Sequence, residues 1–292
     1  MRAKRVLLFA WVATLFFAGI EFAGGKLSHS LALIADSVHL VADAGALGLA
    51  FFASWIAAQP ATRKMSYGYH RVEILAALIN GAGLLTVAIF VAKEALQRFH
   101  NPSPVHPPLM LGIGIAGLVF NLAVAFLLNR AAKENVNVRS AFFHVLSDTL
   151  GSFGVVAAAV IVWKTGWSLA DPVVSIAIAL LVIGGAWQIL RDVVEILLEA
   201  TPSRVNIRQL EERLLSLSGV SEICDLHVWT ISSGKEALSA HLGVHSSADW
   251  ESLLKEVNSI LSQEFGIQHT TIQFENPPAK PHLPHERHEF RP

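Results

Sequence analysis

Long apolar segments separated by short polar stretches dominate the first 200 residues of the chain. The segments cover residues 6–25, 30–57, 74–97, 108–130, 141–164 and 173–198. Each provides the roughly 20 residues that an α-helix needs to cross the hydrocarbon core of a bilayer. The first segment follows a basic start, as in a signal peptide, but no small-x-small cleavage pattern comes after it. We therefore predict an α-helical membrane bundle of six spans, with the first span retained, over residues 1–200.

The ends of these segments carry further signals. The pair Asp171-Pro172 is a typical helix start, and we expect Asp171 to cap the sixth span. Basic residues near the span ends are more numerous on one side, and cytoplasmic loops are the ones enriched in Lys and Arg. This predicts that both termini are cytoplasmic. The richer side carries Arg2, Lys4, Arg5, Arg63, Lys64, Arg71, Arg130, Lys133, Arg139 and Arg191; the other carries Lys26, Lys93, Arg98 and Lys164.

The pattern changes after about residue 200. Helical spacing of apolar residues covers 205–217 and 250–265, and strand-like runs cover 223–231, 237–244 and 270–275. The order αββαβ predicts a small two-layer α+β domain over residues 201–278. Residues 279–292 are rich in Pro and His, which predicts a disordered tail.

Composition agrees with a membrane protein that carries a soluble remainder. Only 15% of the residues are charged and 53% are hydrophobic, whereas soluble domains are typically about 25% charged. The net charge of −1 lacks the basic excess of nucleic-acid-binding proteins, so nucleic acid is not an expected partner. Cys224 is the single cysteine, which excludes an internal disulfide and a cysteine-based zinc ribbon.

Two matching patterns lie inside apolar segments. DSVHLVAD offers His39 and Asp43, and FHVLSD offers His144 and Asp148. A spacing of four places each His and its Asp on one helix face, one turn apart. Two imidazoles and two carboxylates form an N2O2 set that suits tetrahedral Zn2+. Ionisable side chains at membrane depth are costly without a partner or cavity. The patterns therefore predict a divalent metal held within the membrane and moved across it.

Other interpretations stay open at this point. The four residues could be polar contacts between helices, but such hydrogen bonds contribute only about 0.6–2 kcal/mol. A membrane metalloenzyme would keep an open position on the metal, and the sequence has neither HExxH nor GxSxG. We therefore expect no enzyme. A membrane-bound metal sensor without transport is the main alternative. Asp36 shares the face of His39 and could serve as a spare ligand or organise the cavity.

Several motifs together resemble the cation diffusion facilitator family of proton-coupled zinc exporters. They are LALIADSVHLVADA, YGYHRVEILAALIN, HVLSDTLGS, DPVVS, HVWTIS and HTTIQFE, which extend over nearly the whole chain. The resemblance implies a homodimer whose soluble part is metallochaperone-like. It also implies that the transported metal is Zn2+, sometimes Cd2+ or Co2+. The His at position 39 favours zinc, because manganese and iron members tend to have Asp there.

The resemblance also suggests sites outside the membrane. His227, His241, His269 and Glu275 lie on or beside predicted strands and resemble the family's cytoplasmic metal positions. His70 resembles a peripheral loop site. Zn2+ binds neutral imidazole and ionised carboxylate, so protons compete with it. We therefore expect proton antiport out of the cytoplasm, and we expect a bacterial inner membrane protein, since no N-x-S/T acceptor is present.

Overall fold

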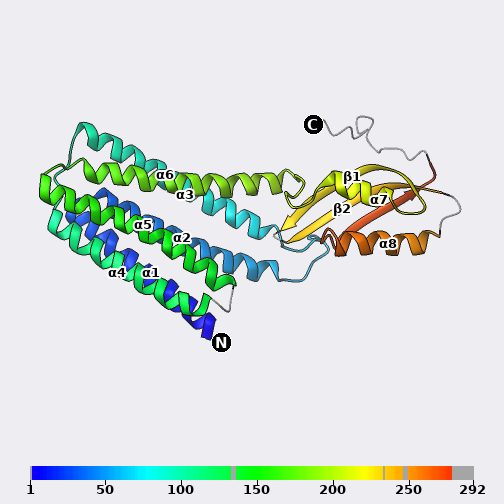
Figure 1. The fold of residues 1–292 in the computed structure, drawn as a ribbon, viewed down its shortest axis with the longest axis horizontal. Helices are drawn as coiled ribbons and strands as arrows, with labels where there is room; N and C mark the ends of the chain where they lie inside the picture. The colour runs from blue at the N-terminus through cyan, green and yellow to red at the C-terminus, as the bar shows by residue number, and fades with distance from the viewer. Residues whose placement is uncertain (1, 133–135, 233, 246–248, 278–292) are drawn as a thin grey trace. The chain divides into compact units, whose positions relative to one another are not determined.

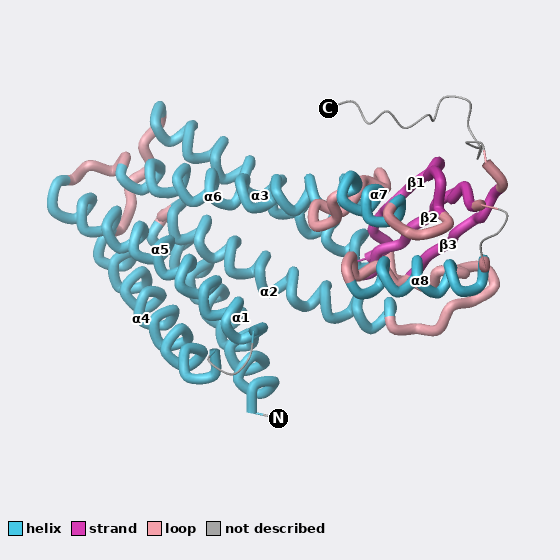
Figure 2. The backbone as a smooth tube through the Cα atoms, turned by 45° about the vertical axis from the view of Figure 1, so that its right-hand side comes forward, coloured by secondary structure: helices cyan, strands magenta, loops and turns pink. Residues whose placement is uncertain are grey.

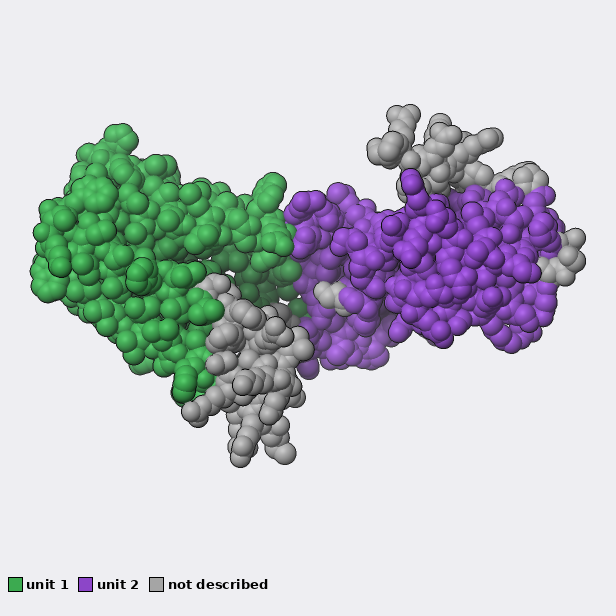
Figure 3. Space-filling model, in the orientation of Figure 1, with its two compact units in different colours: residues 1–53, 76–190 green, residues 54–75, 191–292 purple. Residues whose placement is uncertain are grey.

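The computed structural model describes residues 2–132, 136–232, 234–245 and 249–277 (Figure 1). The predicted tail of residues 279–292 lies outside this part. The described residues form two compact units, one of residues 1–53 with 76–190 and the other of residues 54–75 with 191–292 (Figure 3). The connection after the second span and the end of the sixth helix group with the C-terminal domain in these units, and the division at residue 200 stays a prediction.

Six long helices form the first part of the chain. They are α1 (Arg2–Ser28), α2 (Leu31–Ala57), α3 (Val72–His100), α4 (Pro107–Ala132), α5 (Val136–Thr165) and α6 (Ala170–Leu197). Within the described residues, six helices are long and apolar enough to cross a membrane. Most of the observed helices are longer than the apolar segments. Their end turns carry polar residues, which the apolar pattern does not include. The six-span bundle predicted from the sequence is confirmed.

Alanines are frequent in the interior of this bundle, beside larger residues such as Leu33 and Met110, and many large apolar side chains point outward. Ala32, Ala95 and Ala159 are fully buried where α2, α3 and α5 contribute to one core. Phe16 and Leu181 are more than 70% exposed. Such an outward apolar surface suits lipid rather than water, and close helix contacts through small residues are typical of membrane bundles. The chain is a multi-pass membrane protein.

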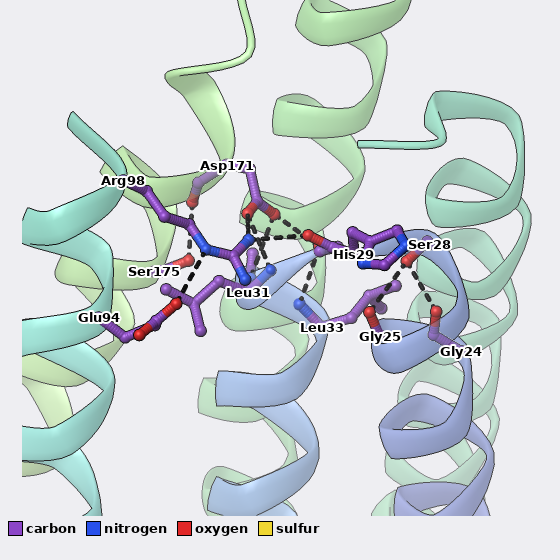
Figure 4. A network of polar contacts seen from close by, with 12 residues as sticks. Gly24, Gly25, Ser28, His29, Leu31, Leu33, Glu94, Arg98, Asp171 and Ser175 are labelled. Atoms are coloured by element: carbon purple, nitrogen blue, oxygen red, sulfur yellow. Dashed lines mark hydrogen bonds and ion pairs between the residues drawn. The ribbon is translucent and has the colours of Figure 1, made fainter. Parts of the chain in front are cut away.

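The junction of α1 and α2 is held by a buried polar network (Figure 4). Asp171 is fully buried and accepts hydrogen bonds from Ser30 Oγ at 2.6 Å and from the backbone N–H groups of Leu31 at 2.8 Å and Ala32 at 3.2 Å. Arg98 Nη1 lies 3.5 Å from the same carboxylate. The prediction that Asp171 caps its own helix is wrong: α6 begins at Ala170, and the carboxylate caps α2 instead.

The C-terminal domain has the predicted αββαβ order. Its elements are α7 (Ile207–Leu215), β1 (Val220–Ser232), β2 (Lys235–Val244), α8 (Trp250–Gln263) and β3 (His269–Glu275). The sheet order is β1-β2-β3 (Figure 2). Strand β1 is antiparallel to β2, and β3 is parallel to it. Leu210 of α7 and Leu261 of α8 pack with the fully buried Leu242 of β2 in one core. Both helices place their apolar stripe on the sheet, so the α+β prediction is confirmed.

Candidate metal centre

A histidine and two carboxylates meet inside the membrane bundle. Asp43 lies one turn after His39 on α2, and Asp148 comes from α5. His39 Nδ1 is 3.4 Å from Asp43 Oδ2, and His39 Nε2 is 3.5 Å from Asp148 Oδ1. The candidate ligand atoms of these three residues all lie within 4.8 Å of one another. We call His39, Asp43 and Asp148 the membrane group.

His144 is the fourth residue predicted for this site. It belongs to α5 and precedes Asp148 by one helical turn, but its side chain lies outside the described part of the structure. The structure therefore brings together three of the four predicted ligands. A four-residue spacing on α5 places His144 on the same helix face as Asp148.

The side chains of the membrane group are largely buried, which favours a positive charge, a proton or a metal ion, between the two carboxylates. The Asp148 side chain is only 6% exposed, and those of His39 and Asp43 are 26% and 20% exposed. The imidazole ring lies between the two carboxylates, with one nitrogen directed to each. Both nitrogens can donate hydrogen bonds only in the protonated ring. A divalent cation offers the same two carboxylates a stronger counter-charge and one ring nitrogen a ligand bond. The arrangement can therefore exchange a proton for a metal ion.

Asp36 does not join the membrane group. Its side chain is 1% exposed, and Asp36 Oδ2 accepts a hydrogen bond from Ser152 Oγ at 3.1 Å. Asn121 Nδ2 donates to the same hydroxyl at 3.0 Å. The carboxylate thus links α2 to α4 and α5 beside the membrane group. Of the two roles expected from the sequence, this geometry favours an organising residue over a spare ligand.

A second group of histidines and acids lies on the sheet of the C-terminal domain. His241 Nδ1 on β2 is 2.8 Å from Glu275 Oε1 on β3, and His241 Nε2 is 3.8 Å from Asp225 Oδ2 on β1. His227 Nε2 is 3.4 Å from Asp225 Oδ1. We call Asp225, His227, His241 and Glu275 the sheet group. It contains three of the four residues predicted for a cytoplasmic site.

The other two predicted histidines lie apart from the sheet group. His269 pairs with Ala237 at the opposite end of the β2–β3 ladder, and its ring meets Tyr67 edge-on with centroids 5.5 Å apart. His70 has the ammonium of Lys235 at 3.0 Å from its Nε2 atom. A metal ion beside His70 would have to displace this cation. Both residues stay predictions as ligands.

Sequence reasoning missed Asp225, a member of the sheet group, and Cys224, its neighbour. Asp225 joins both histidines and has a positive φ of 56°, where β1 is irregular between Cys224 and His227. Cys224 pairs directly with His241 across the ladder. Burial raises the pKa of the Cys224 thiol, and the neighbouring carboxylates of Glu275, Glu222 and Asp225 raise it further. The sequence CDLH at residues 224–227 places three candidate ligands close together and could have indicated Asp225. Strand periodicity alone, however, does not reveal the bulge that turns Asp225 towards His241.

Two family models account for nearly the whole chain. The model of the cation efflux transmembrane domain matches residues 7–198, and that of the cation efflux protein cytoplasmic domain matches residues 202–277. The chain belongs to the cation diffusion facilitator family. The predicted resemblance is thereby confirmed, and the C-terminal α+β domain is the cytoplasmic domain of this family.

Curated relatives in the cation diffusion facilitator family match along most of their length. The chain is 39% identical over 277 residues to a cadmium, cobalt and zinc/H+-K+ antiporter of Bacillus subtilis, covering 93% of this chain and 89% of the relative. It is 38% identical to the zinc transporter ZitB of Escherichia coli, covering 94% and 88%. It is 37% identical to the metal cation efflux system protein CzcD of Cupriavidus metallidurans, covering 95% and 88%.

Proposed function

We propose that this chain exports Zn2+ from the cytoplasm in exchange for protons, and that His39, Asp43, His144 and Asp148 form the transport site. The observation that carries the proposal is the membrane group, whose candidate ligand atoms lie within 4.8 Å of one another inside a bundle of six apolar helices. The names of the relatives support zinc, cadmium and cobalt as substrates.

The exchange follows from the chemistry of the ligands. Metal binding requires neutral imidazole and ionised carboxylate, so it releases protons, and a rise in proton concentration weakens it. In a state open to the cytoplasm, Zn2+ displaces the proton that His39 shares with Asp43 and Asp148. In a state open to the other side, protons return to these groups and the metal leaves. Secondary transporters commonly alternate access in this way around a site near the bilayer midplane.

The sheet group is a candidate for a second metal site with a structural or regulatory role. Its imidazole and carboxylate atoms suit Zn2+, and three strands contribute to it, so a bound ion would crosslink the sheet. Membership of the family leads us to expect a homodimer with both termini in the cytoplasm. The molar mass of the purified protein in detergent, corrected for bound detergent, tests the dimer.

Metal flux into sealed vesicles tests the proposed function. The purified chain is reconstituted with a fluorescent zinc indicator inside the vesicles, and a pH gradient is imposed. We expect Zn2+ uptake when the lumen is acidic, together with outward proton movement. Binding without flux would favour the membrane-bound metal sensor. Flux of zinc that is indifferent to the pH gradient and moves no protons would remove the antiport.

A further inference from the structure

A buried carboxyl group in α1 has no role in the metal site described above. Glu21 is 1% exposed, and its Oε2 atom has no hydrogen-bond partner among the residues that the structure describes. Its Oε1 atom faces Gly117 of α4, where an added Cβ would lie only 2.4 Å away. The small residue on α4 therefore leaves the space that this carboxyl group occupies. Phe17 closes the same space from one turn earlier on α1.

A second buried carboxyl group lies towards the membrane group. Asp36 on α2 is also 1% exposed, and its Oδ1 atom likewise has no hydrogen-bond partner within the described ranges. This atom faces Gly151 of α5, where an added Cβ would lie 3.1 Å away. The other oxygen, Oδ2, is oriented by Ser152, which is oriented in turn by Asn121. Four helices thus converge on two carboxyl groups, each with one oxygen that has no hydrogen bond to the described residues.

The two carboxyl groups connect electrostatically to the membrane group. Glu21 faces Gly117 of α4, and Asn121, one turn later on α4, donates to the Ser152 hydroxyl that orients Asp36. Asp36 lies one turn before His39 on α2, and its hydrogen-bond donor Ser152 lies one turn after Asp148 on α5. Apart from Asp148 of the membrane group, the described residues of α4 and α5 that contact the two carboxyl groups, Asn121, Ser152 and the two glycines, carry no charge. A change of charge at the membrane group is therefore felt at Asp36 and passed on to Glu21.

A purely structural role accounts poorly for Glu21. A buried polar atom without a partner costs free energy, and an ionised carboxylate costs far more than a neutral carboxyl group. Contacts between helices at this position could be made by an uncharged side chain without that cost. Ionisable residues inside membrane bundles are characteristic of ion and proton pathways. The free oxygen of each carboxyl group is a position at which a proton can bind.

We propose that Glu21 is a proton-carrying residue of the transport cycle, coupled to the membrane group through Asp36. The inference rests on the proposed function. When Zn2+ reaches the membrane group, its positive charge favours ionised carboxylates nearby, and Glu21 releases one proton to water. When the metal leaves, two neighbouring carboxylates again repel each other, and one proton returns to Glu21. This proton is additional to those that the metal ligands exchange and adds one to the protons exchanged per ion.

Zinc binding to the purified full-length protein in detergent tests this role. Protons released per bound Zn2+ are measured with a pH indicator, and the dissociation constant is followed over a range of pH. Glu21→Gln keeps the size of the side chain and removes its titration. We expect the variant to bind Zn2+ and to release fewer protons. The zinc affinity of the variant should depend less steeply on pH than that of the wild type. The difference is up to about tenfold per pH unit, because one linked proton is lost.

Two further variants separate titration from shape. Glu94→Gln removes a carboxylate of α3 that pairs with Arg98, and it should leave the proton count unchanged. Glu21→Asp keeps a titrating group, so it should release the normal number of protons while the midpoint of its pH dependence shifts. An unchanged proton count in Glu21→Gln overturns the inference, and so does a loss in Glu21→Asp. If Glu21→Gln is not recovered folded, an unshifted midpoint in Glu21→Asp overturns it.

The proposed function fails separately from this inference. A wild-type protein that binds no Zn2+ and moves none across vesicles contradicts the proposed function itself. If the wild-type protein transports Zn2+ and the zinc affinity of Glu21→Gln has the same pH dependence as the wild type, only the role of Glu21 is contradicted.

Discussion

The membrane group and the sheet group combine the same kinds of side chain in different surroundings. In the membrane group, two long helices bring His39, Asp43 and Asp148 together, and the backbone groups of those helices are already hydrogen-bonded within the helix. In the sheet group, the His227 side chain is 44% exposed, whereas those of Asp225 and His241 are only 9% and 10% exposed. The sheet group is therefore open to solvent at His227, in a domain outside the membrane helices.

The difference decides how strongly each group points to a metal. Ion pairs between histidine and carboxylate near a protein surface are common and contribute little, so the exposed His227 beside Asp225 has an ordinary explanation. Charged groups inside a membrane bundle are rare and usually mark an ion pathway. The comparison therefore supports the proposed transport role of the membrane group and the proposed structural or regulatory role of the sheet group. The predictions below test this division in order of expected effect.

Loss of a membrane carboxylate should have the largest effect. Asp148 and Asp43 provide the two negative charges that balance a divalent ion. Asp148→Ala therefore leaves one positive charge of the ion unbalanced. We expect zinc flux in vesicles to fall at least about 100-fold, since altering even the surroundings of a metal ligand costs 10–100-fold. The variant should still elute as a folded protein in size-exclusion chromatography.

Asp192→Ala is the control for this change, because Asp192 is an exposed carboxylate of α6. It should transport at the normal rate. Normal flux in Asp148→Ala would mean that the four-residue transport site is wrong.

Exchange of an imidazole for a carboxylate should change selectivity more than stability. His39→Asp makes the membrane group richer in oxygen ligands, and Mn2+ prefers these more than Zn2+ does. We expect competition between the two ions in vesicle flux to shift towards Mn2+, roughly tenfold, with a lower rate for Zn2+. An unchanged preference would place the selectivity of the transporter outside His39.

Metal binding at the sheet group should appear as stability of the cytoplasmic domain. The domain has its own core of apolar residues from α7, α8 and the sheet, so the segment of residues 202–277 should fold alone. At Zn2+ concentrations a hundred times the dissociation constant, binding stabilises by about 2.7 kcal/mol. That corresponds to a rise in melting temperature on the order of 10 °C for a domain of this size.

Two histidine variants make this measurement specific. His241→Gln removes a residue that contacts both Asp225 and Glu275, and it should shrink the rise. His245→Ala changes an exposed residue and should leave the rise intact. A full response in His241→Gln would remove that residue from the site. If the wild-type domain does not respond to zinc, the sheet group is a set of ion pairs only.

Much of the architecture could be predicted from periodicity and length. Runs of about 20 apolar residues allow few structures other than membrane helices, and alternation separated the strands from the helices of the cytoplasmic domain. The four-residue spacing of His39 and Asp43 placed both on one face. Nothing local in the sequence, however, predicts that Asp171 bonds to Leu31, because the two residues are 140 positions apart.

The details missed at the two groups share the same physical cause. Asp225 joins the sheet group through a bulge with a positive φ, and strand patterns do not locate bulges. In the sequence, Glu21 is a single acidic residue in an apolar segment. Only the fold shows that it lies against Gly117 of α4. In both cases the role depends on contacts between segments far apart in the chain, and residue type alone does not determine these.

The smallest predicted effect concerns a helix cap away from both groups. Asp249 begins α8, and its carboxylate accepts hydrogen bonds from Ser252 Oγ at 2.7 Å and from the backbone N–H of Glu251 at 3.2 Å. The bonds to Ser252 are the main cause that holds the pKa of Asp249 below its usual value. A carboxyl group with a lowered folded-state pKa stabilises the fold above its unfolded-state pKa of about 3.9 and loses that contribution as pH falls through the folded value.

Asp249→Ala should therefore lower the melting temperature of the cytoplasmic domain by roughly 2–5 °C at pH 7, and by less as the pH falls below about 4. The decrease should be the same with and without Zn2+, because changes at independent sites add. Glu251→Gln serves as the control, since it alters an exposed ion pair with Lys255 and should change little. A decrease that depends on Zn2+ would show that the sheet group is coupled to α8. The helix cap and metal binding would then not contribute independently to the stability of this domain.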